Sequence, residues 1–537
     1  MHIKMNWLFL RSVRRRYSRC KAHWLALFVW LVALCPVTPV FAARHAPHTP
    51  ADTVVTNCSN DTQLNQAVTA AGTTTITFSC GAGLHTIPIS TAMQVAGEVT
   101  IDGGGQIALD GGKLAAFFQV FSGHKLELRN LTLQNGKFNG VHPLENFGEL
   151  VLTNVLVQNN QTTGQGGAVA NYHTLVVRDS IFMSNVAIST NAITGSGGAL
   201  YTDGGAATVE NSTFTNNHIQ GTVGVGGAIS VQSGQTTITG STFNGNNALD
   251  GGGLYVNSGA TVTVTQSTFI SNTAGYGGAI ENQGQLQVKF STLRQNKANN
   301  DGGAIWVLNG NLGLAYSTVA NNRAGTLGGG ISCYANTLSV GYSTISGNSA
   351  SGSNGVGGGG IYSTCNLTVM NTTISGNAAT GNGGGAIYQK SSGNATVAAT
   401  TIAGNTAAFG AGVYNDGAGA STLSLHYTML ANNVTGNCDG VITSLGYNLA
   451  DDSNCAALTQ PGDQKNINLP LGPLANNGGT TLTHLPLTGN PALDAIPTPC
   501  SFTDDQRGIA RPQNGKCDIG AVEVTAVQFA YLPLLMK

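Results

Sequence analysis

The sequence predicts an all-β protein, a right-handed parallel β-helix with three short strands in each turn and a cap at both ends. Three observations support this prediction. A repeat of about 26 residues runs from near residue 126 to residue 433. Each copy begins with Gly-Gly-Ala-Ile or a close variant, continues with apolar residues at strand spacing, and ends in Asn. A fixed period of this size is typical of stacked units that cannot bury their apolar face alone.

The apolar residues of each copy indicate short strands separated by a bend. Leu286 and Val288 lie two apart, which is strand periodicity, but the next apolar residue, Leu293, lies five further on. The chain must therefore bend between them, and a Ser-Thr pair such as Ser317-Thr318 marks this place. Gly-Gly-Ala-Ile supplies another strand after a tight turn. No segment has a sustained helical period, so no helix is expected.

The Asn that closes each copy predicts a ladder of stacked amides inside a turn. Each amide side chain can donate to the next one and accept from the previous one. A ligand role is the alternative, but a binding site does not need every turn, which favours the structural interpretation. The series is Asn185, Asn217, Asn246, Asn272, Asn296, Asn322, Asn348, Asn377, Asn405 and Asn433.

The first 42 residues are typical of a signal peptide. A basic stretch precedes the apolar run 24–34, and Val40-Phe41-Ala42 offers a small-residue cleavage site. The apolar run is short for a membrane span, although an uncleaved anchor is the alternative. Seven of the 23 Lys and Arg residues and none of the 24 Asp and Glu residues lie in this segment, which leaves a mature net charge of −8. We therefore expect an extracellular or cell-surface protein that does not bind nucleic acid.

The eight cysteines of the mature chain fall into four local pairs. Export to an oxidising space favours disulfides. The sequence has no Cys-x-x-Cys motif, so the cysteines do not indicate a zinc site. We expect no metal and no cofactor. Other connectivities stay open, but the local pairs are Cys58–Cys80, Cys333–Cys365, Cys438–Cys455 and Cys500–Cys517.

Six segments follow from these patterns. Residues 1–42 are the signal peptide, 43–53 a linker, 54–125 an N-terminal cap with the first turns, 126–435 the repeats, 436–523 a separate domain and 524–537 a tail. Gly-Gly-Ala-Ile with Phe-x-x-Asn, as from Phe182 to Asn185 and from Phe269 to Asn272, resembles the repeat pair of chlamydial polymorphic outer-membrane proteins. Those proteins are surface adhesins built on a β-helix, so the resemblance implies adhesion.

The segment 436–523 resembles the choice-of-anchor Q domain of secreted bacterial surface proteins. The motifs are Ser-Leu-Gly-Tyr-Asn-Leu at 444–449, Asn-Gly-Gly at 477–479, Asp-Gln-Arg-Gly at 505–508 and Cys-Asp-Ile-Gly-Ala-Val-Glu at 517–523. This resemblance implies an extracellular location and surface association through the C-terminal region, and it implies no chemistry. We expect Arg507 and Arg511 to pair with Asp505, Asp518 or Glu523 and to fix a closing loop.

An enzyme is the alternative, because many β-helices of the pectin-lyase type are polysaccharide lyases or glycoside hydrolases. Hydrolysis needs two carboxylates about 5–10 Å apart. The only periodic acidic pair is Asp250 and Asp301, each directly before Gly-Gly, with Tyr276 at the intervening position. Asp before Gly-Gly is ordinary turn chemistry, so no catalytic residue is assigned. The acids of the repeats are Asp179, Asp203, Glu210, Asp250, Glu281, Asp301 and Asp416.

One stripe of aromatic residues is predicted to point outward. It occupies the position after the inward aliphatic residue, where other copies have Ser230, Glu281 or Ser332. Two interpretations stay open: the rings stack on a polysaccharide, or they stack across strands and stabilise the sheet. The expected function is adhesive or structural, with a polysaccharide or another cell-surface ligand as partner. The stripe consists of Tyr201, Tyr255, Trp306, Tyr362, Tyr388 and Tyr414.

Overall fold

The computed structural model describes residues 52–525 except 71, 139–141, 191–193, 335, 353–356, 382, 391–392 and 418–420. The chain divides into two units, 1–47 and 48–537, and the first lies outside the described residues. The predicted signal peptide therefore lies outside them too, as do most of the linker and of the C-terminal tail. No helix in the described part of the chain is long and apolar enough to cross a membrane.

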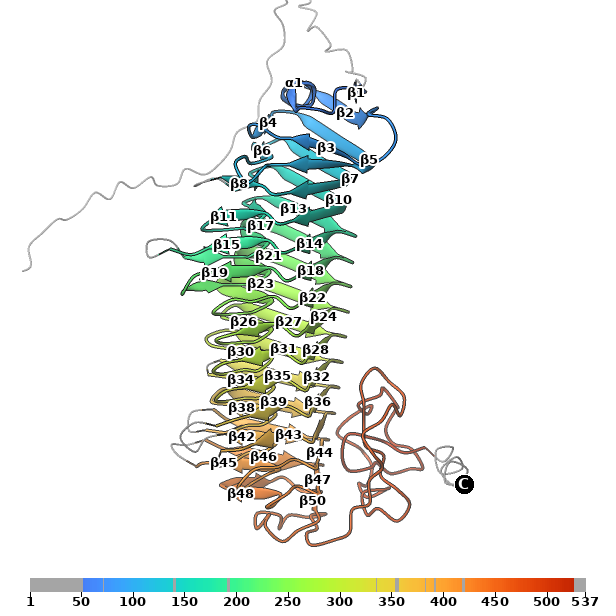
Figure 1. Ribbon diagram of the computed structural model, residues 1–537. Coiled ribbons are helices and arrows are strands. Elements are labelled where there is room, and N and C mark those ends of the chain that lie inside the picture. The colour runs from blue at the N-terminus through green and yellow to red at the C-terminus, as the bar shows by residue number, and fades with distance from the viewer. Residues whose placement is uncertain are drawn as a thin grey trace, which may run out of the picture. The chain divides into compact units, whose positions relative to one another are not determined.

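The second unit is a stack of coils in which each strand pairs in parallel with its equivalent one coil later (Figure 1). For example, β27 (Gln285–Lys289) pairs with β31 (Asn311–Ala315), which pairs with β35 (Thr337–Gly341). This confirms the predicted all-β fold, a parallel β-helix. Three main columns of strands run along the stack.

The first column holds the strands that follow Gly-Gly in the repeats. Its members are β4 (Met93–Val95), β6 (Phe118–Val120), β9 (Leu144–Asn146), β12 (Val169–Asn171), β17 (Leu200–Glu210), β21 (Ile229–Thr239), β23 (Leu254–Thr265), β26 (Ile280–Asn282), β30 (Ile305–Val307), β34 (Ile331–Cys333), β38 (Ile361–Ser363), β42 (Ile387–Gln389), β45 (Val413–Asn415) and β48 (Cys438–Gly440). β17, β21 and β23 continue into the second column.

The second column carries the alternating apolar pair of each repeat. It also contains β1 (Thr53–Val55), β2 (Thr73–Phe78), β5 (Glu98–Asp110), β7 (Lys125–Gln134), β10 (Glu149–Gln158), β13 (Thr174–Arg178), β39 (Asn366–Met370), β43 (Ala395–Ala398), β46 (Leu423–His426) and β49 (Ile442–Ser444). β5, β7 and β10 continue into the third column.

The third column carries the apolar residue beyond the bend. Its other members are β3 (His85–Pro88), β14 (Ile181–Met183), β18 (Thr213–Thr215), β22 (Thr242–Asn244), β24 (Thr268–Ile270), β28 (Thr292–Arg294), β32 (Thr318–Ala320), β36 (Thr344–Ser346), β40 (Thr373–Ser375), β44 (Thr401–Ala403), β47 (Met429–Ala431) and β50 (Leu449–Ala450).

Very short strands between the ladder position and the next first-column strand form additional sheets, which the sequence did not predict. They are β8 (Lys137–Phe138), β11 (Gln161–Thr163), β15 (Val186–Ile188) and β19 (His218–Gln220), then β25 (Thr273–Ala274), β29 (Lys297–Ala298), β33 (Arg323–Ala324), β37 (Ser349–Ala350) and β41 (Ala378–Ala379), with β16 (Gly195–Ser196) beside β20 (Gly224–Val225).

The inward residues form one continuous core along the stack. Leu286, Val288 and Leu293, which defined the strands in the sequence, are at most 1% exposed. Phenylalanines at the third-column position stack inside the coil, with ring centroids 4.4–5.0 Å apart from Phe182 to Phe269. The periodic apolar pattern is therefore the buried face of the coil.

The predicted bend lies at the Ser-Thr pairs and is closed by a hydrogen-bond ladder. Tyr316 has a φ of 50° and turns the chain just before Ser317. The Ser317 hydroxyl donates to the carbonyl of Ala315 over 2.8 Å and accepts the backbone N–H of Ser291 over 3.1 Å. The hydroxyl therefore satisfies buried backbone groups that the bend takes out of the sheet.

The amide ladder is confirmed. Asn322 donates to the Oδ1 of Asn348 over 2.9 Å, and Asn348 donates to Asn377 over 2.9 Å and to the carbonyl of Val319 over 2.9 Å. The ladder also begins one coil earlier than expected, because Asn160 donates to Asn185 over 3.0 Å. Each amide is buried with its hydrogen-bonding capacity used, which supports the structural interpretation.

Replacing Asn348 with Ala should lower the free energy of unfolding by about 1–3 kcal/mol, because its ladder neighbours lose buried partners. Urea unfolding followed by circular dichroism measures this. Asn309→Ala, at an exposed side chain, is the control and should change little. Equal effects of the two substitutions would contradict a contribution of the amide ladder to the stability of the folded protein.

A short helix, α1 (Thr62–Thr69), lies at the N-terminal end of the stack, although no helix was expected (Figure 1). It has 8 residues and buries Leu64 and Val68 against the first coils. Two helical turns are too few for a periodic pattern to stand out in the sequence. The helix covers the core where the first coil has no preceding coil.

The stacking continues beyond the predicted end of the repeats at residue 435. β48, β49 and β50 pair in parallel with β45, β46 and β47, so one more coil extends to Ala450. Between Asp451 and Thr525 the chain forms no helix or strand, only isolated bridges. The expected boundary is thus one coil early.

The C-terminal region lies along the flank of the stack beside β36, β40 and β44, and does not only close its end (Figure 1). Tyr342 donates to Asp504 over 2.9 Å, Thr344 to the carbonyl of Leu482 over 2.5 Å, and Thr373 to Gln506 over 2.6 Å. The expectation of a simple cap is wrong in this respect. Polar outward side chains of two adjacent coils thus hold the region in place.

Buried ion pairs fix this region, as expected. Arg507 contacts Asp505 over 2.8 Å and Arg511 contacts Glu523 over 3.1 Å, with all four side chains at most 2% exposed. Asp518 instead accepts the backbone N–H groups of residues 494 and 524 over 2.7 and 2.6 Å.

All four predicted disulfides are formed: Cys58–Cys80, Cys333–Cys365, Cys438–Cys455 and Cys500–Cys517. The exported protein should therefore show no titratable thiols before reduction and eight after reduction and unfolding. Thiol titration and peptide mapping check this. A different connectivity would contradict the coil register, because Cys333 and Cys365 lie in adjacent coils.

Candidate functional site

The aromatic stripe is not an exposed platform. Tyr201, Tyr255, Tyr362 and Tyr388 are only 3–8% exposed, and Trp306 and Tyr414 are partly exposed. Of the two interpretations of the stripe, this burial favours stacking across strands over stacking on a polysaccharide. The rings lie outside the core of the coil, as their strand position required, but other groups cover them.

The cover comes from neighbouring stripe residues and from the loop that precedes Gly-Gly. Tyr388 packs between Tyr362 and Tyr414, with ring centroids 5.5 and 4.8 Å apart. The loop residue Tyr276 stacks on Trp306 at 4.3 Å. A Cβ at Gly384, where φ is 69°, would lie 2.6 Å from the Cβ of Tyr388, so only Gly lets the turn close over the ring. The stripe therefore packs across strands and stabilises the sheet.

The acidic pair that the sequence singled out does not form one site. Asp301 is a turn anchor, because it accepts hydrogen bonds from the backbone N–H of Leu327 over 3.0 Å and from Tyr334 over 2.5 Å. Asp250 instead affects the pKa of Glu281. Glu281 occupies a stripe position that holds an aromatic ring in other coils. Burial raises the pKa of Asp250 to about 6, and burial together with the charge of Asp250 raises the pKa of Glu281 to about 8.

Glu281 is enclosed. It is 1% exposed and accepts a hydrogen bond from Gln283 over 2.7 Å, while its Oε2 has no partner among the described residues. A carboxyl group in this setting favours the protonated form. It has the proton-holding property of a general acid, but a substrate cannot reach a group so buried.

The raised pKa predicts a pH dependence of stability. The folded protein keeps a proton on Glu281 where the unfolded chain has lost it, so stability falls as the pH rises from about 4.5 to about 8. Glu281→Gln should flatten this fall and melt higher than the wild type at pH 8, with a smaller difference at pH 5. Melting curves at the two pH values measure it. Parallel pH profiles would show that Glu281 titrates normally.

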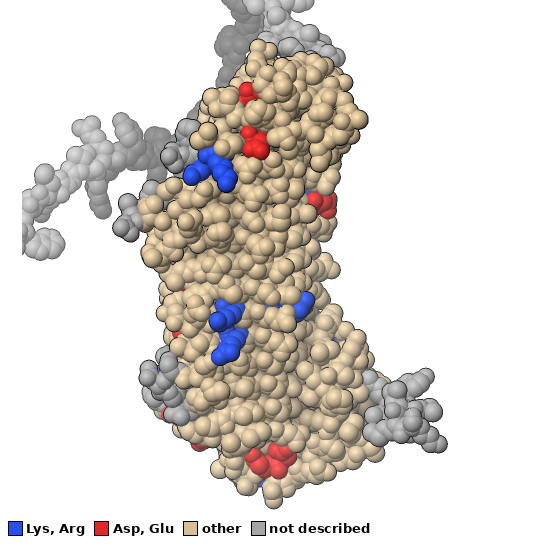
Figure 2. Space-filling view, viewed as in Figure 1, with Lys and Arg blue, Asp and Glu red and all other residues tan. Residues whose placement is uncertain are grey.

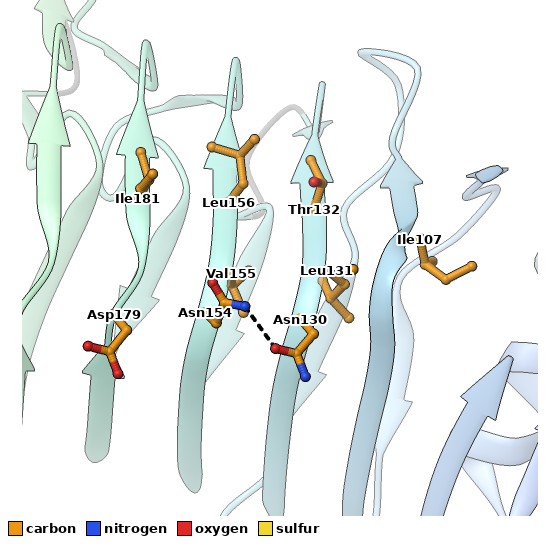
Figure 3. A pocket seen from close by; sticks show the side chains of 10 residues that line it. Ile107, Asn130, Leu131, Thr132, Asn154, Val155, Leu156, Asp179 and Ile181 are labelled. Carbon is orange, nitrogen blue, oxygen red and sulfur yellow. Dashed lines mark hydrogen bonds between the residues drawn. The ribbon is translucent and has the colours of Figure 1, made fainter. Parts of the chain in front are cut away.

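A shallow trough of about 190 Å³ crosses consecutive N-terminal coils at the bend between the second and third columns (Figure 3). Asn130, Asn154 and Asp179 form one rim, and Leu156 and Ile181 lie opposite. Asn154 donates to Asn130 over 2.8 Å, and Asn130 donates to Asp102 over 3.0 Å. Ile181 is 45% exposed. The trough thus joins ordered amides to an open apolar wall.

Exposed rings lie at a different corner of the same coils. Phe121 and Phe147 are 36% and 37% exposed and directly follow β6 and β9, and Tyr172 directly follows β12. Phe147 stacks on Tyr172 with centroids 4.9 Å apart. Sequence reasoning missed these rings because it followed the stripe position, and they lie two residues beyond it. Their recurrence in consecutive copies was the available signal.

Charge is sparse on the surface, and Lys and Arg form small separate groups on the face seen in Figure 2. No group of three or more His, Cys, Asp or Glu residues suited to a metal ion occurs within the described ranges.

Comparison with known protein families matches part of the chain. The model of the family described as "Right handed beta helix region" matches residues 116–293 and 183–324. This agrees with the parallel stack and gives its hand. No curated protein matches the chain.

Proposed function

We propose that this chain is an exported protein of the cell surface or extracellular space, with an adhesive or structural role and a polysaccharide or another cell-surface ligand as partner. The trough at Asn130, Asn154 and Ile181 carries the ligand part of this proposal. The N-terminal segment and four disulfides are consistent with an oxidising, exported location. The resemblance of the C-terminal region to an anchor domain supports surface association.

The trough suits an extended, polyhydroxylated chain. Its rim groups recur once per coil, about 4.8 Å apart, which is the spacing of the strands. Asn154 and Asn130 are already oriented by hydrogen bonds, so ordering them on binding costs little. The Asp179 carboxylate forms no hydrogen bond or ion pair within the described ranges and is free to accept from hydroxyl groups. Leu156 and Ile181 offer the apolar surface that ligand sites combine with such polar groups.

A glycan array probed with residues 43–537 tests this proposal. The wild type should bind, and the variant Leu156→Ser with Ile181→Ser should bind less while its melting curve stays close to that of the wild type. Val441→Ser, at a side chain that is 59% exposed near the C-terminal end of the stack, is the matched control and should bind normally. Absence of wild-type binding to every glycan would remove the ligand part of the proposal.

A polysaccharide lyase or glycoside hydrolase is the second candidate, favoured by the raised pKa of Glu281 beside Asp250. The burial of Glu281 argues against it, because two accessible carboxylates are needed on one face. Incubation with polysaccharides and analysis of product size decides between the two. Cleavage by the wild type but not by Glu281→Gln would establish the enzyme.

A further inference from the structure

The exposed rings belong to an ordered array of outward side chains on four consecutive coils. Strands β6, β9, β12 and β17 pair in parallel, one after the other. In this register Val120 lies beside Asn146, and Asn146 lies beside Asn171. Successive residues of a strand point to opposite sides, so residues two apart share a side. The outward pairs are Gln119 with Phe121, Glu145 with Phe147, Ala170 with Tyr172, and Tyr201 with Asp203.

Two rings of this array, those of Phe147 and Tyr172, are held by contacts with other rings, and Phe147 stays accessible. Phe147 lies parallel to Tyr172, with an interplanar angle of 10°. Tyr172 in turn meets Tyr201 edge-on at 6.1 Å. Within the described ranges Phe147 stacks on no other ring, and 37% of the residue stays exposed. A fixed, exposed ring is a large contact surface that loses little conformational entropy when a ligand binds.

Hydrogen-bonding groups surround the rings. Glu145 accepts from Gln119 over 2.8 Å, which leaves further lone pairs on its carboxylate. The Tyr172 hydroxyl lies 3.3 Å from the Nε2 of His142. Asp203 accepts from Ser233 over 2.7 Å and from Tyr201 over 3.3 Å. A few placed polar groups beside an apolar surface are what orient a small ligand in a site.

The charge of the array selects among ligands. Neither Glu145 nor Asp203 forms an ion pair in the described part of the chain. Burial lowers the pKa of His142, so its imidazole is neutral at neutral pH and does not offset them. The array is therefore negative, and it disfavours a ligand that carries carboxylates or sulfates.

We propose that Phe121, Phe147 and Tyr172 bind the pyranose rings of a non-acidic polysaccharide, with Glu145 accepting hydrogen bonds from its hydroxyl or ammonium groups. The inference rests on the proposed function, since both concern glycans. It assigns the ligand class and a site at a different corner of the coil from the trough.

The test uses a double variant that carries both Phe121→Leu and Phe147→Leu. Its control is Phe290→Leu, at a residue that is 47% exposed and lies outside the array. Leu keeps the apolar contacts and removes the flat ring. Titration calorimetry with cellohexaose and with a glucosamine hexamer should show about tenfold weaker binding for the double variant, and unchanged binding for the control. Oligogalacturonate should bind the wild type more weakly than either hexamer.

A second variant, Glu145→Lys, tests the charge argument independently. It should weaken binding of the glucosamine hexamer and strengthen binding of oligogalacturonate. The inference is overturned if the double Leu variant, with an unchanged melting curve, binds both hexamers like the wild type. Loss of binding only in the trough variant would overturn it and leave the proposed function standing, whereas a wild type that binds no glycan would overturn both.

Discussion

Replacing Arg511 with Met should lower the free energy of unfolding of the C-terminal region by about 3–5 kcal/mol, because it leaves a buried carboxylate without its cation. The guanidinium contacts Glu523 over 3.1 Å and donates to the carbonyls of Asp518 and Gly520 over 2.6 and 2.7 Å. Glu523 is 0% exposed, and burial already raises its pKa. Without Arg511 the carboxyl group must take up a proton or reach water.

Urea unfolding, together with the rate of proteolysis after residue 450, measures this effect. Lys516→Met is the control, because Lys516 is exposed and forms no ion pair within the described ranges. Similar stability of the two variants would mean that the buried pairs do not hold the C-terminal region on the flank of the stack.

Ile345→Ala should lower the free energy of unfolding by about 2–5 kcal/mol, because it opens a cavity in the middle of the core. Ile345 is 0% exposed and lies between its register partners Val319 and Ile374. Each coil depends on its neighbours, so a cavity in one coil also weakens the adjoining two.

Ile181→Ala provides the matched comparison in the same column of strands. Ile181 points outward and is 45% exposed, so this substitution should cost less than about 0.5 kcal/mol. Urea unfolding of both variants measures the difference. Equal costs would contradict the inward and outward assignment on which the fold description depends.

The strands, the core, the bend at the Ser-Thr pairs and the amide ladder follow closely from the repeat. Leu286, Val288 and Leu293 are buried as their spacing predicted, and Asn348 lies in the ladder its recurrence indicated. These features are local and recur in nearly every coil. Each copy of the repeat therefore shows the same need for buried apolar residues and a ladder Asn, which makes the pattern easy to recognise. The disulfides were predictable for a related reason, since each joins cysteines that are close in sequence.

The surface was harder to predict. The alternation of residues along a strand predicts which side of the coil a residue faces. It does not predict which loops or side chains cover that residue. Tyr362 faces outward as predicted and is nevertheless 3% exposed, because neighbouring rings and the preceding loops cover the stripe. The contact of Thr344 with Leu482 joins segments 138 residues apart, and no local pattern signals it.

The decisive measurement is the binding of residues 43–537 to defined polysaccharides, with product size measured in the same samples. We expect the wild type to bind non-acidic pyranose chains and to leave their length unchanged. We also expect binding to fall when the trough residues Leu156 and Ile181, or the rings of Phe121 and Phe147, are replaced. Shortened chains, or no binding to any polysaccharide by the folded protein, would contradict an adhesive role.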